Sequence, residues 1–506
     1  MSVTNIVQTC KGKVRGIKKD HVTIFRSIPY ARAPIGEYRW KPPHEAESWE
    51  GVRECTTFGN IPWQPEGFVG TEALVRYPQS EDCLYLNIWT PAENENENLP
   101  VLFWIHGGAF LGGAAHENLY NGENLALKGV IVVSISYRLG IFGFLAHPDF
   151  NTERSDGTIG LESGSGNFGL LDIIFGLKWV KQNIYNFGGD PNRVTIAGQS
   201  AGGMAVQCLL SSPMAKGQFS GAIIQSAGPS VWRKKTQQEA ENIGLKIAEI
   251  LGCKGEAELR KVEPCELRDL SGKYSAMTFA PVTDGKVLPI QPAEAFLRDE
   301  ISQVPIMMGS NSHECLSTPL FTSNRSEFLS SIQEFWKEKY SLLEAVYNTE
   351  SKQIALEMGG DFDFVNIQYF LRRIIKKHTC PVYQYYFSQP IILEDGTDLG
   401  AVHSSELFYV FDTLNCMGGS TIDGTKMLVK HEKEDAILAD NMTTYWTNFV
   451  KNGNPNSPEL EQWHAFTKEN QKFLHFHAKA VQEELNLHLE KTAVIEKWYE
   501  NELHLF

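Results

Sequence analysis

The sequence predicts an α/β fold in which a large, mostly parallel sheet is flanked by helices. Apolar runs typical of buried strands occur at 101–105, 193–197 and 222–225, and helical segments alternate with them. The chain has 506 residues, of which 42% are hydrophobic, so it can bury a large core. Sheets of this class often stay in one domain at such a length. We therefore expect a single domain over 1–506.

The segment around Ser200 predicts a serine nucleophile. It reads G-Q-S-A-G at 198–202, between the second of these strands and a helix expected over 203–210. A strand, a sharp turn and a helix in this order present the serine at a nucleophile elbow, and the two glycines leave room for the turn. The N–H of Ala201 faces the same space and can stabilise an oxyanion. Taken alone, the motif also fits a serine that caps an ordinary helix.

A second turn predicts the rest of an oxyanion hole. The strand at 101–105 runs into H-G-G-A-F at 106–110. Turns of this type supply backbone N–H groups to the oxyanion in esterases, and here these would be the groups of Gly108 and Ala109. Backbone donors are fixed before the reaction, so no reorganisation is needed when charge develops. The alternative is a glycine-rich turn without a catalytic role.

Charge and hydropathy exclude several classes of partner. A net charge of −15 argues against nucleic acid and against an anionic membrane surface. No apolar run is long enough to span a bilayer, so we expect a small-molecule substrate and leave the oligomeric state open. Five basic residues interrupt the first twenty positions, where a secretory signal would be apolar. We therefore expect a cytoplasmic protein, or a secreted one if a signal has been removed.

Two other patterns are expected to carry no cofactor or metal. The motif G-x-G-x-x-G at 164–169 follows no apolar strand, which argues against dinucleotide binding. His475 and His477 alternate on a late strand, but no third ligand stands at a recognisable spacing. Elsewhere, an amphipathic helix is expected over 234–251, and a helical insertion at about 320–380 is expected to frame a substrate gorge.

Further motifs follow in order along the chain. They are R-S-I-P-Y-A at 26–31, E-D-C-L-Y-L-N-I-W at 81–89, Y-R-L-G at 137–140, G-N-F-G-L-L-D at 166–172 and Y-W-T-N-F at 445–449. Together with the two turns, they resemble the type B carboxylesterase and cholinesterase family of α/β-hydrolases over about 12–463. Ala109 stands where animal members have a third glycine, and in this the chain resembles the bacterial p-nitrobenzyl-esterase-like carboxylesterases of the family.

The resemblance implies an α/β-hydrolase fold and ester hydrolysis by a Ser-His-Glu triad. Its acid falls on Glu314 and its base on His403, and the chain order Ser200, Glu314, His403 is the one expected of this fold. From the residues alone, several of the 14 histidines remain eligible as the base. Glu406 is the next candidate for the acid. Such a triad forms an acyl-enzyme and requires no cofactor and no metal.

The resemblance also implies contacts that hold the fold together. Cys55 and Cys83 match a pair that is bridged in the family, and Cys253 and Cys265 lie near a second bridge. Nine reduced thiols in a cytoplasmic protein are an equal alternative. Two buried structural ion pairs are also implied, Arg138 with Asp172 and Arg39 with Glu81.

The substrate is less certain than the chemistry. Six positions are expected at the substrate pocket: Leu74, Gln199, Trp232, Ser275, Met277 and Phe279. Ser275 and Met277 replace the phenylalanines that crowd the acyl pocket of acetylcholinesterases, which favours acyl chains longer than acetyl. The expected substrates are carboxylic esters of short to medium acyl chains with aryl or alkyl alcohols. Leu74 and Gln199 replace a tryptophan and a glutamate that attract a cation, which argues against choline esters. Hormone-ester hydrolysis and a binding or adhesion role without catalysis are the remaining alternatives.

Overall fold

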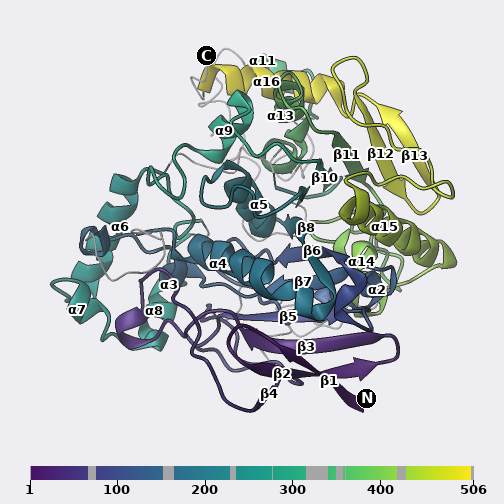
Figure 1. Cartoon of the computed structure of the whole chain (residues 1–506). Helices are drawn as coiled ribbons and strands as arrows, with labels where there is room; N and C mark the ends of the chain where they lie inside the picture. Colours follow the sequence, from purple (N-terminus) through teal and green to yellow (C-terminus); the bar gives the residue numbers. More distant parts are fainter. Residues whose placement is uncertain are drawn as a thin grey trace.

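The computed structural model describes residues 2–65, 76–151, 165–227, 235–275, 277–314, 340–348, 357–358, 360–418 and 429–502. Within these ranges thirteen strands form one sheet, which runs through the molecule from β1, beside the N-terminus, to the hairpin of β12 and β13 (Figure 1). No helix in the described part of the chain combines the length and the apolar character needed to cross a membrane.

The sheet is antiparallel at both edges and parallel in the middle. Its order is β1 (Ser2–Gln8), β2 (Lys13–Lys19), β3 (Val22–Pro29), β5 (Tyr85–Thr90), β7 (Ile131–Ile135), β6 (Leu99–Ile105), β8 (Gly189–Gln199), β9 (Gly221–Gln225), β10 (Ile306–Asn311), β11 (Val382–Phe387), β12 (Lys472–His477) and β13 (Ala480–Leu485), while β4 (Val52–Glu54) pairs with β2. All neighbouring pairs from β7 to β12 are parallel. The predicted mostly parallel α/β fold is confirmed.

The central strand β6 is buried and apolar from Pro100 to Ile105 because both faces of the sheet are covered. In β6, Val101, Phe103 and Ile105 belong to one hydrophobic core, and Leu102 and Trp104 belong to the other. Successive side chains of a strand point to opposite faces, so this alternation assigns one core to each face.

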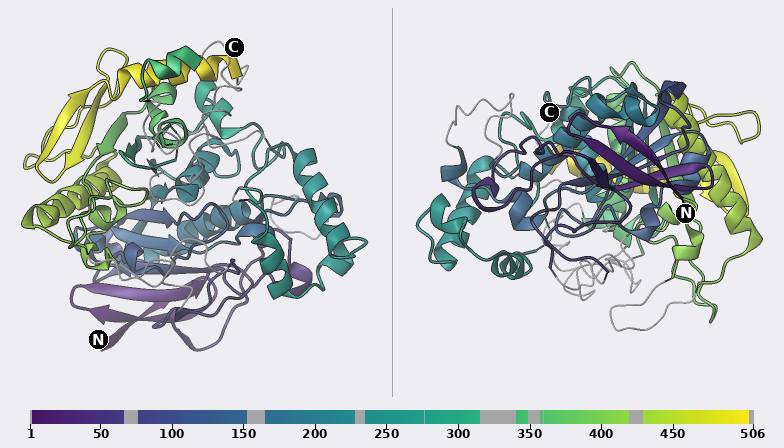
Figure 2. Two further views of the ribbon diagram at one scale, coloured as in Figure 1. Left: turned by 180° about the vertical axis from the view of Figure 1, so that it is seen from behind. Right: turned by 60° about the horizontal axis from the view of Figure 1, so that its bottom comes forward.

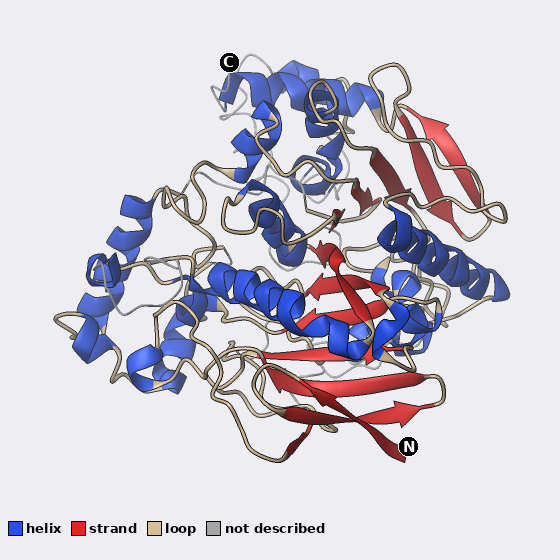
Figure 3. Ribbon diagram, in the orientation of Figure 1, coloured by secondary structure: helices blue, strands red, loops and turns tan. Residues whose placement is uncertain are grey.

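The helices divide between these two cores, and Figure 3 shows them on either side of the strands. The first core includes residues of α3 (Gly140–Phe144), α4 (Phe168–Asn183), α5 (Ala201–Ser211), α6 (Gln237–Ile250), α7 (Glu256–Leu259), α8 (Pro264–Ser271), α9 (Pro292–Arg298) and α13 (Ile367–Ile374). The second includes residues of α2 (Glu123–Leu127), α14 (Leu407–Val410) and α15 (Lys433–Asn452). The helix expected over 234–251 is α6, which begins at a capping box of Thr236 and Glu239.

The expected helical insertion at about 320–380 is described only in part, because 315–339, 349–356 and 359 lie outside the described residues. The described part contains α11 (Tyr340–Glu344), the π-helix η9 (Asp361–Val365) and α13. Tyr347 and Lys491 both contact Asp361, at 2.9 Å and 3.1 Å. Since Lys491 lies on α16 (Leu489–Glu502), these contacts join η9 to the C-terminal helix.

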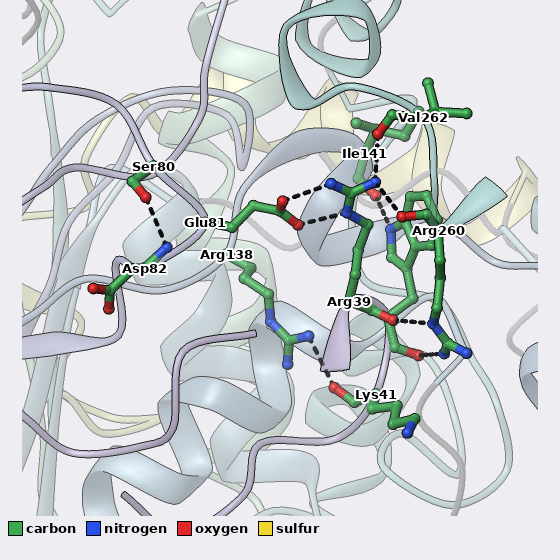
Figure 4. Close-up of polar contacts among 10 residues, drawn as sticks. Arg39, Lys41, Ser80, Glu81, Asp82, Arg138, Ile141, Arg260 and Val262 are labelled. Carbon is green, nitrogen blue, oxygen red and sulfur yellow. Dashed lines mark hydrogen bonds and ion pairs between the residues drawn. The ribbon is translucent and has the colours of Figure 1, made fainter. Parts of the chain in front are cut away.

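Two buried ion pairs lie in the region where α3, α7 and α8 gather to one side of the sheet, as labelled in Figure 1; the left view of Figure 2 shows the molecule from behind. Arg138 binds both carboxylate oxygens of Asp172, at 2.6 Å and 2.7 Å. Arg39 binds Glu81 in the same two-pronged way, at 2.6 Å for each bond, and also donates to the carbonyl groups of Arg260 and Val262 (Figure 4). The hydrogen bonds of these arginines to described residues go to a partner carboxylate or to backbone carbonyls, and their guanidinium groups also lie over the rings of Trp40 and Phe168, so they belong to the architecture.

Candidate active site

Ser200 lies at the sharp turn between β8 and α5. Its backbone adopts φ 56° and ψ −127°, a conformation that is unfavourable for a residue with a side chain. Its N–H donates to the carbonyl of Gln225 on β9, and its own carbonyl accepts from Met204 in the first turn of α5. The strand, turn and helix predicted around the serine are therefore present, and the strained residue is the serine itself.

The two glycines of this turn are required by close backbone contacts. A Cβ atom on Gly202 would lie 2.0 Å from the carbonyl oxygen of Ile105, at the end of β6. A Cβ atom on Gly198 would lie 2.4 Å from the carbonyl carbon of Gly202. Neither neighbour is a side chain that can move aside, so only glycine fits at the two positions.

The turn after β6 lies directly against the elbow. A Cβ atom on Gly107 would lie 3.2 Å from Cβ of Ser200. Gly108 and Ala109 both have positive φ, 105° and 52°, and are partly exposed beside the partly exposed Ser200. Within the described residues, the N–H groups of Gly108, Ala109 and Ala201 have no acceptor. Three unpaired donors beside one serine can bind a negatively charged oxygen.

His403 and Glu314 form a hydrogen-bonded pair next to this turn. His403 Nδ1 lies 2.6 Å from Glu314 Oε2. Glu314 follows β10, His403 precedes α14, and a bridge between His313 and Val402 joins the two loops. Because an ionised carboxylate only accepts, Nδ1 carries a hydrogen and the neutral ring has its lone pair at Nε2. The imidazole is thus arranged as a base.

The charges around His403 favour its protonated form. Burial alone would lower the pKa of His403, but the hydrogen bond and charge of Glu314, with the charge of Glu406, outweigh burial and hold this pKa above its usual value. The ring of Phe364, on η9, packs against the imidazole with 4.8 Å between ring centroids. Glu314 and Phe364 thus contact the ring from two separate parts of the chain.

The nitrogen of His403 that would act on Ser200 contacts another residue. His403 Nε2 lies 3.1 Å from Nε2 of Gln199, and Ser200 Oγ makes no hydrogen bond within the described part of the chain. The structure therefore brings Glu314 and His403 into direct contact, and places Ser200 beside the residue that holds His403. Bonds between base and nucleophile are often long in enzymes without substrate.

Sequence reasoning missed residues that support the pair. Asn311 donates its backbone N–H to Glu314 and its side-chain amide to Glu406, both at 2.6 Å. Glu406 also accepts from Gln225 at 3.2 Å and is fully buried. Burial and the charge of Glu314 raise the pKa of Glu406 to about 7. Phe364 carried no signal in the sequence, whereas Asn311 stands close enough to Glu314 to have suggested a contact.

The expected pocket residues are placed unevenly. Leu74 and Trp232 lie outside the described residues. Phe279 is buried against Tyr274, with 5.5 Å between ring centroids, and Met277 is half-buried against the first core. Ser275 is exposed, and its hydroxyl lies 2.9 Å from that of Thr278. Of the six, only Gln199 contacts a residue of the expected triad within the described part of the chain.

The structure does not contain the two disulfides that the resemblance suggested. Cys55, Cys83, Cys253 and Cys265 all carry free thiols. Burial raises the pKa of Cys55 to about 12 and that of Cys83 above its usual value, so both remain protonated near neutral pH. The first two cysteines therefore pack as small apolar side chains, which is the alternative that the spacing left open.

The late histidine pair has a structural explanation. His475 contacts Glu484 through Nδ1 at 2.7 Å and Ser388 through Nε2 at 2.6 Å. Both ring nitrogens are therefore engaged by protein groups. Among the described residues no cluster of three or more acidic, histidine or cysteine side chains is arranged to hold a metal ion.

The parallel sheet, the strained serine between β8 and α5 and the acid–histidine pair beyond β10 and β11 define an α/β-hydrolase. A model of the carboxylesterase family matches residues 3–495. The chain therefore belongs to the carboxylesterase family, of type B, and it is a carboxylic ester hydrolase.

Individual relatives agree with this assignment over nearly the whole chain. It is 35% identical to the para-nitrobenzyl esterase of Bacillus subtilis (strain 168), over 93% of this chain and 94% of that protein. It is 33% identical to the fumonisin B1 esterase of Sphingopyxis macrogoltabida, over 91% and 84%. The solved carboxylesterase of Geobacillus stearothermophilus matches with a TM-score of 0.82 and 32% identity, over 97% of this chain and 99% of that one.

Proposed function

We propose that the protein hydrolyses carboxylic esters of short to medium acyl chains through Ser200, His403 and Glu314. The observation that carries this proposal is the strained backbone of Ser200, which is held between β8 and α5 beside three N–H donors that have no acceptor among the described residues. Strain of this kind persists only where the surrounding structure imposes it, as at a nucleophile.

The proposed reaction has two steps with the same geometry. His403 Nε2 takes the hydroxyl proton of Ser200 while Oγ bonds to the ester carbonyl carbon, and the oxyanion is bound by the N–H groups of Gly108, Ala109 and Ala201. The carbon–oxygen bond to the alcohol then breaks, and His403 returns the proton to the leaving alcohol. Water repeats the sequence on the acyl-enzyme and releases the acid. Glu314 orients the imidazole and stabilises its charged form.

Ser200→Ala tests the nucleophile. We expect it to remove nearly all hydrolysis of p-nitrophenyl esters and all covalent labelling by a fluorophosphonate, with the fold retained. Ser211→Ala, at the far end of α5, is the matched control, because the Ser211 hydroxyl donates to the carbonyl of Gln207 within the same helix. Full labelling of Ser200→Ala would assign the nucleophile to another serine. Folded wild-type protein that neither labels nor hydrolyses would support a binding role.

The acyl specificity rests on Ser275 and Met277. If these small and adaptable side chains leave space, each added methylene contributes up to about 0.8 kcal/mol until the pocket is filled. We expect kcat/KM to rise from acetate to butyrate or hexanoate esters and then to fall for long chains. A preference for acetate would show that other side chains close the pocket. Met277→Phe should shorten the preferred chain, and an unchanged profile would remove Met277 from the lining.

The alcohol side of the substrate needs a separate comparison. The relatives at similar identity are named for different esters, among them fumonisin B1 and p-nitrobenzyl esters. A panel of choline, aryl and bulky secondary-alcohol esters with one common acyl group would separate these classes. Because Gln199 is neutral, we expect no preference for choline over an uncharged alcohol of equal size.

A further inference from the structure

Gln199 is the last residue of β8 and immediately precedes the nucleophile. Its side chain is almost fully buried, with 2% exposed. Its backbone pairs with Gln225 in β9, and its carbonyl and side-chain oxygens lie 2.8 Å and 3.2 Å from where a Cβ atom on Gly107 would stand. The carboxamide is therefore held between the sheet and the oxyanion turn and cannot swing into solvent.

From this position the carboxamide contacts the catalytic imidazole. Nε2 of Gln199 lies 3.1 Å from Nε2 of His403. The other ring nitrogen donates to Glu314, so Nε2 of His403 carries the lone pair and the Gln199 amide is the donor. This lone pair is the one that must accept the proton of Ser200. A single lone pair cannot serve both donors at full strength.

We propose that Gln199 is a positioning residue that holds the base away from Ser200 in the empty enzyme, so that catalysis requires Nε2 of His403 to pass from Gln199 to Ser200. This inference rests on the proposed triad. It explains why Ser200, which follows Gln199 directly in the chain, makes no hydrogen bond to the base within the described residues. It also gives Gln199 a role in how fast the empty enzyme reacts. This role is separate from any effect of Gln199 on the choice between choline esters and esters of uncharged alcohols.

The contact has a measurable electrostatic consequence. A donor on Nε2 stabilises the neutral imidazole and opposes Glu314 and Glu406, the two charged groups that raise the pKa of His403. Phe364, the described residue whose ring packs against the imidazole, carries no charge. Removal of the donor should therefore favour protonation of His403 and at the same time free its lone pair for Ser200 at pH values where the ring is neutral.

Gln199→Met tests the proposal, because methionine has a similar length and no donor. The readout is the second-order rate of covalent labelling by a small neutral fluorophosphonate as a function of pH, which does not depend on deacylation. We expect the acid limb to move to higher pH, and the rate above it to rise roughly fivefold, the factor that one neutral hydrogen bond of ordinary strength represents. An unchanged limb and an unchanged plateau would overturn the proposal.

Two further measurements separate this proposal from its alternatives. Gln199→Glu should move the acid limb higher still, because a carboxylate stabilises the imidazolium and cannot donate to the neutral ring. Crystal structures of the free wild-type enzyme and its phosphonyl adduct need no variant: we expect the Gln199–His403 contact in the first and its loss in the second. The same contact in both would overturn the proposal. Labelling that persists in Ser200→Ala would instead overturn the proposed function.

Discussion

Asn311 donates its side-chain amide to Glu406 across 2.6 Å. Its backbone N–H donates to Glu314 at the same distance, so one residue links the acid of the proposed triad to a second buried carboxyl group. The pKa of Glu406 is raised to about 7 by burial and by Glu314. Asn311 therefore connects the catalytic pair to a carboxyl group, that of Glu406, whose pKa lies near neutral pH.

Glu406→Gln should change how stability depends on pH. The folded state raises the pKa of Glu406 from 4.5 to about 7, so folded protein binds this proton more tightly than unfolded protein between these values. The resulting stability is fully present below the unfolded pKa and is lost as pH rises through 7. We expect this component, up to about 3 kcal/mol, to be absent from Glu406→Gln. Urea unfolding of both proteins between roughly pH 5 and 8 measures it, and parallel curves would contradict it.

Glu314→Gln should weaken catalysis and shift its pH profile. His403 must be neutral to act as a base, so kcat/KM falls as pH drops through its raised pKa. Without the carboxylate that pKa is lower, and the acid limb should move to lower pH. We expect kcat to fall on the order of a thousandfold or more, and His403→Ala to be roughly a hundredfold worse. Equal rates for wild type and Glu314→Gln would place the acid elsewhere, with Glu406 next.

Gly202→Ala should disrupt the elbow. The added Cβ atom would lie 2.0 Å from the carbonyl oxygen of Ile105, so β6 and α5 must separate. We expect a loss of about 1–3 kcal/mol in the free energy of unfolding, with activity reduced because Ser200 moves. Gly217→Ala is the control: its φ of 77° is also unfavourable for alanine, but no atom lies within 4 Å of the new Cβ. Wild-type activity in Gly202→Ala would contradict the close contact.

We expect a thiol assay in denaturant and without reductant to detect nine free thiols, one for each cysteine of the chain. Eight of these residues lie in the described ranges, and all eight are free. Closing the loop between Cys55 and Cys83 with a disulfide would contribute roughly 3 kcal/mol, so in its absence reductant should leave the melting temperature unchanged. Intact-mass analysis without reductant provides a second check. A mass lower by two hydrogens for each disulfide would contradict the prediction that all cysteines are free thiols.

Local patterns predicted the parts of the site that are local. The elbow at 198–202 and the turn at 106–110 each depend on a few consecutive residues, and both are present as expected. Glu314 and His403 are 89 positions apart and meet because β10 and β11 pair in parallel and end at the same edge. Residue patterns alone left several histidines eligible, and only the family resemblance singled out this pair.

Other features of the site were not indicated by any pattern in the amino-acid sequence. The contact of Gln199 with His403 depends on the direction of two side chains whose positions differ by 204 residues. The buried state of Glu406 depends on packing against β9 and β10, which no spacing reveals. The state of the cysteines was left open for a related reason, since spacing matches two cysteines to a family pair but does not show whether their sulfur atoms meet, and in the structure the described cysteines are free thiols.

Arg39 and Arg260 each donate to the backbone carbonyl of the other, at 3.1 Å and 2.7 Å (Figure 4). The two residues are 221 positions apart, and closing so long a loop costs entropy before its contacts can form. We therefore expect these bonds to form late in folding, after the strands that lie between the two residues in the sequence have paired. Interactions that are absent from the folding transition state act on the unfolding rate. We therefore expect loss of the reciprocal pair to speed unfolding of the enzyme more than it slows folding.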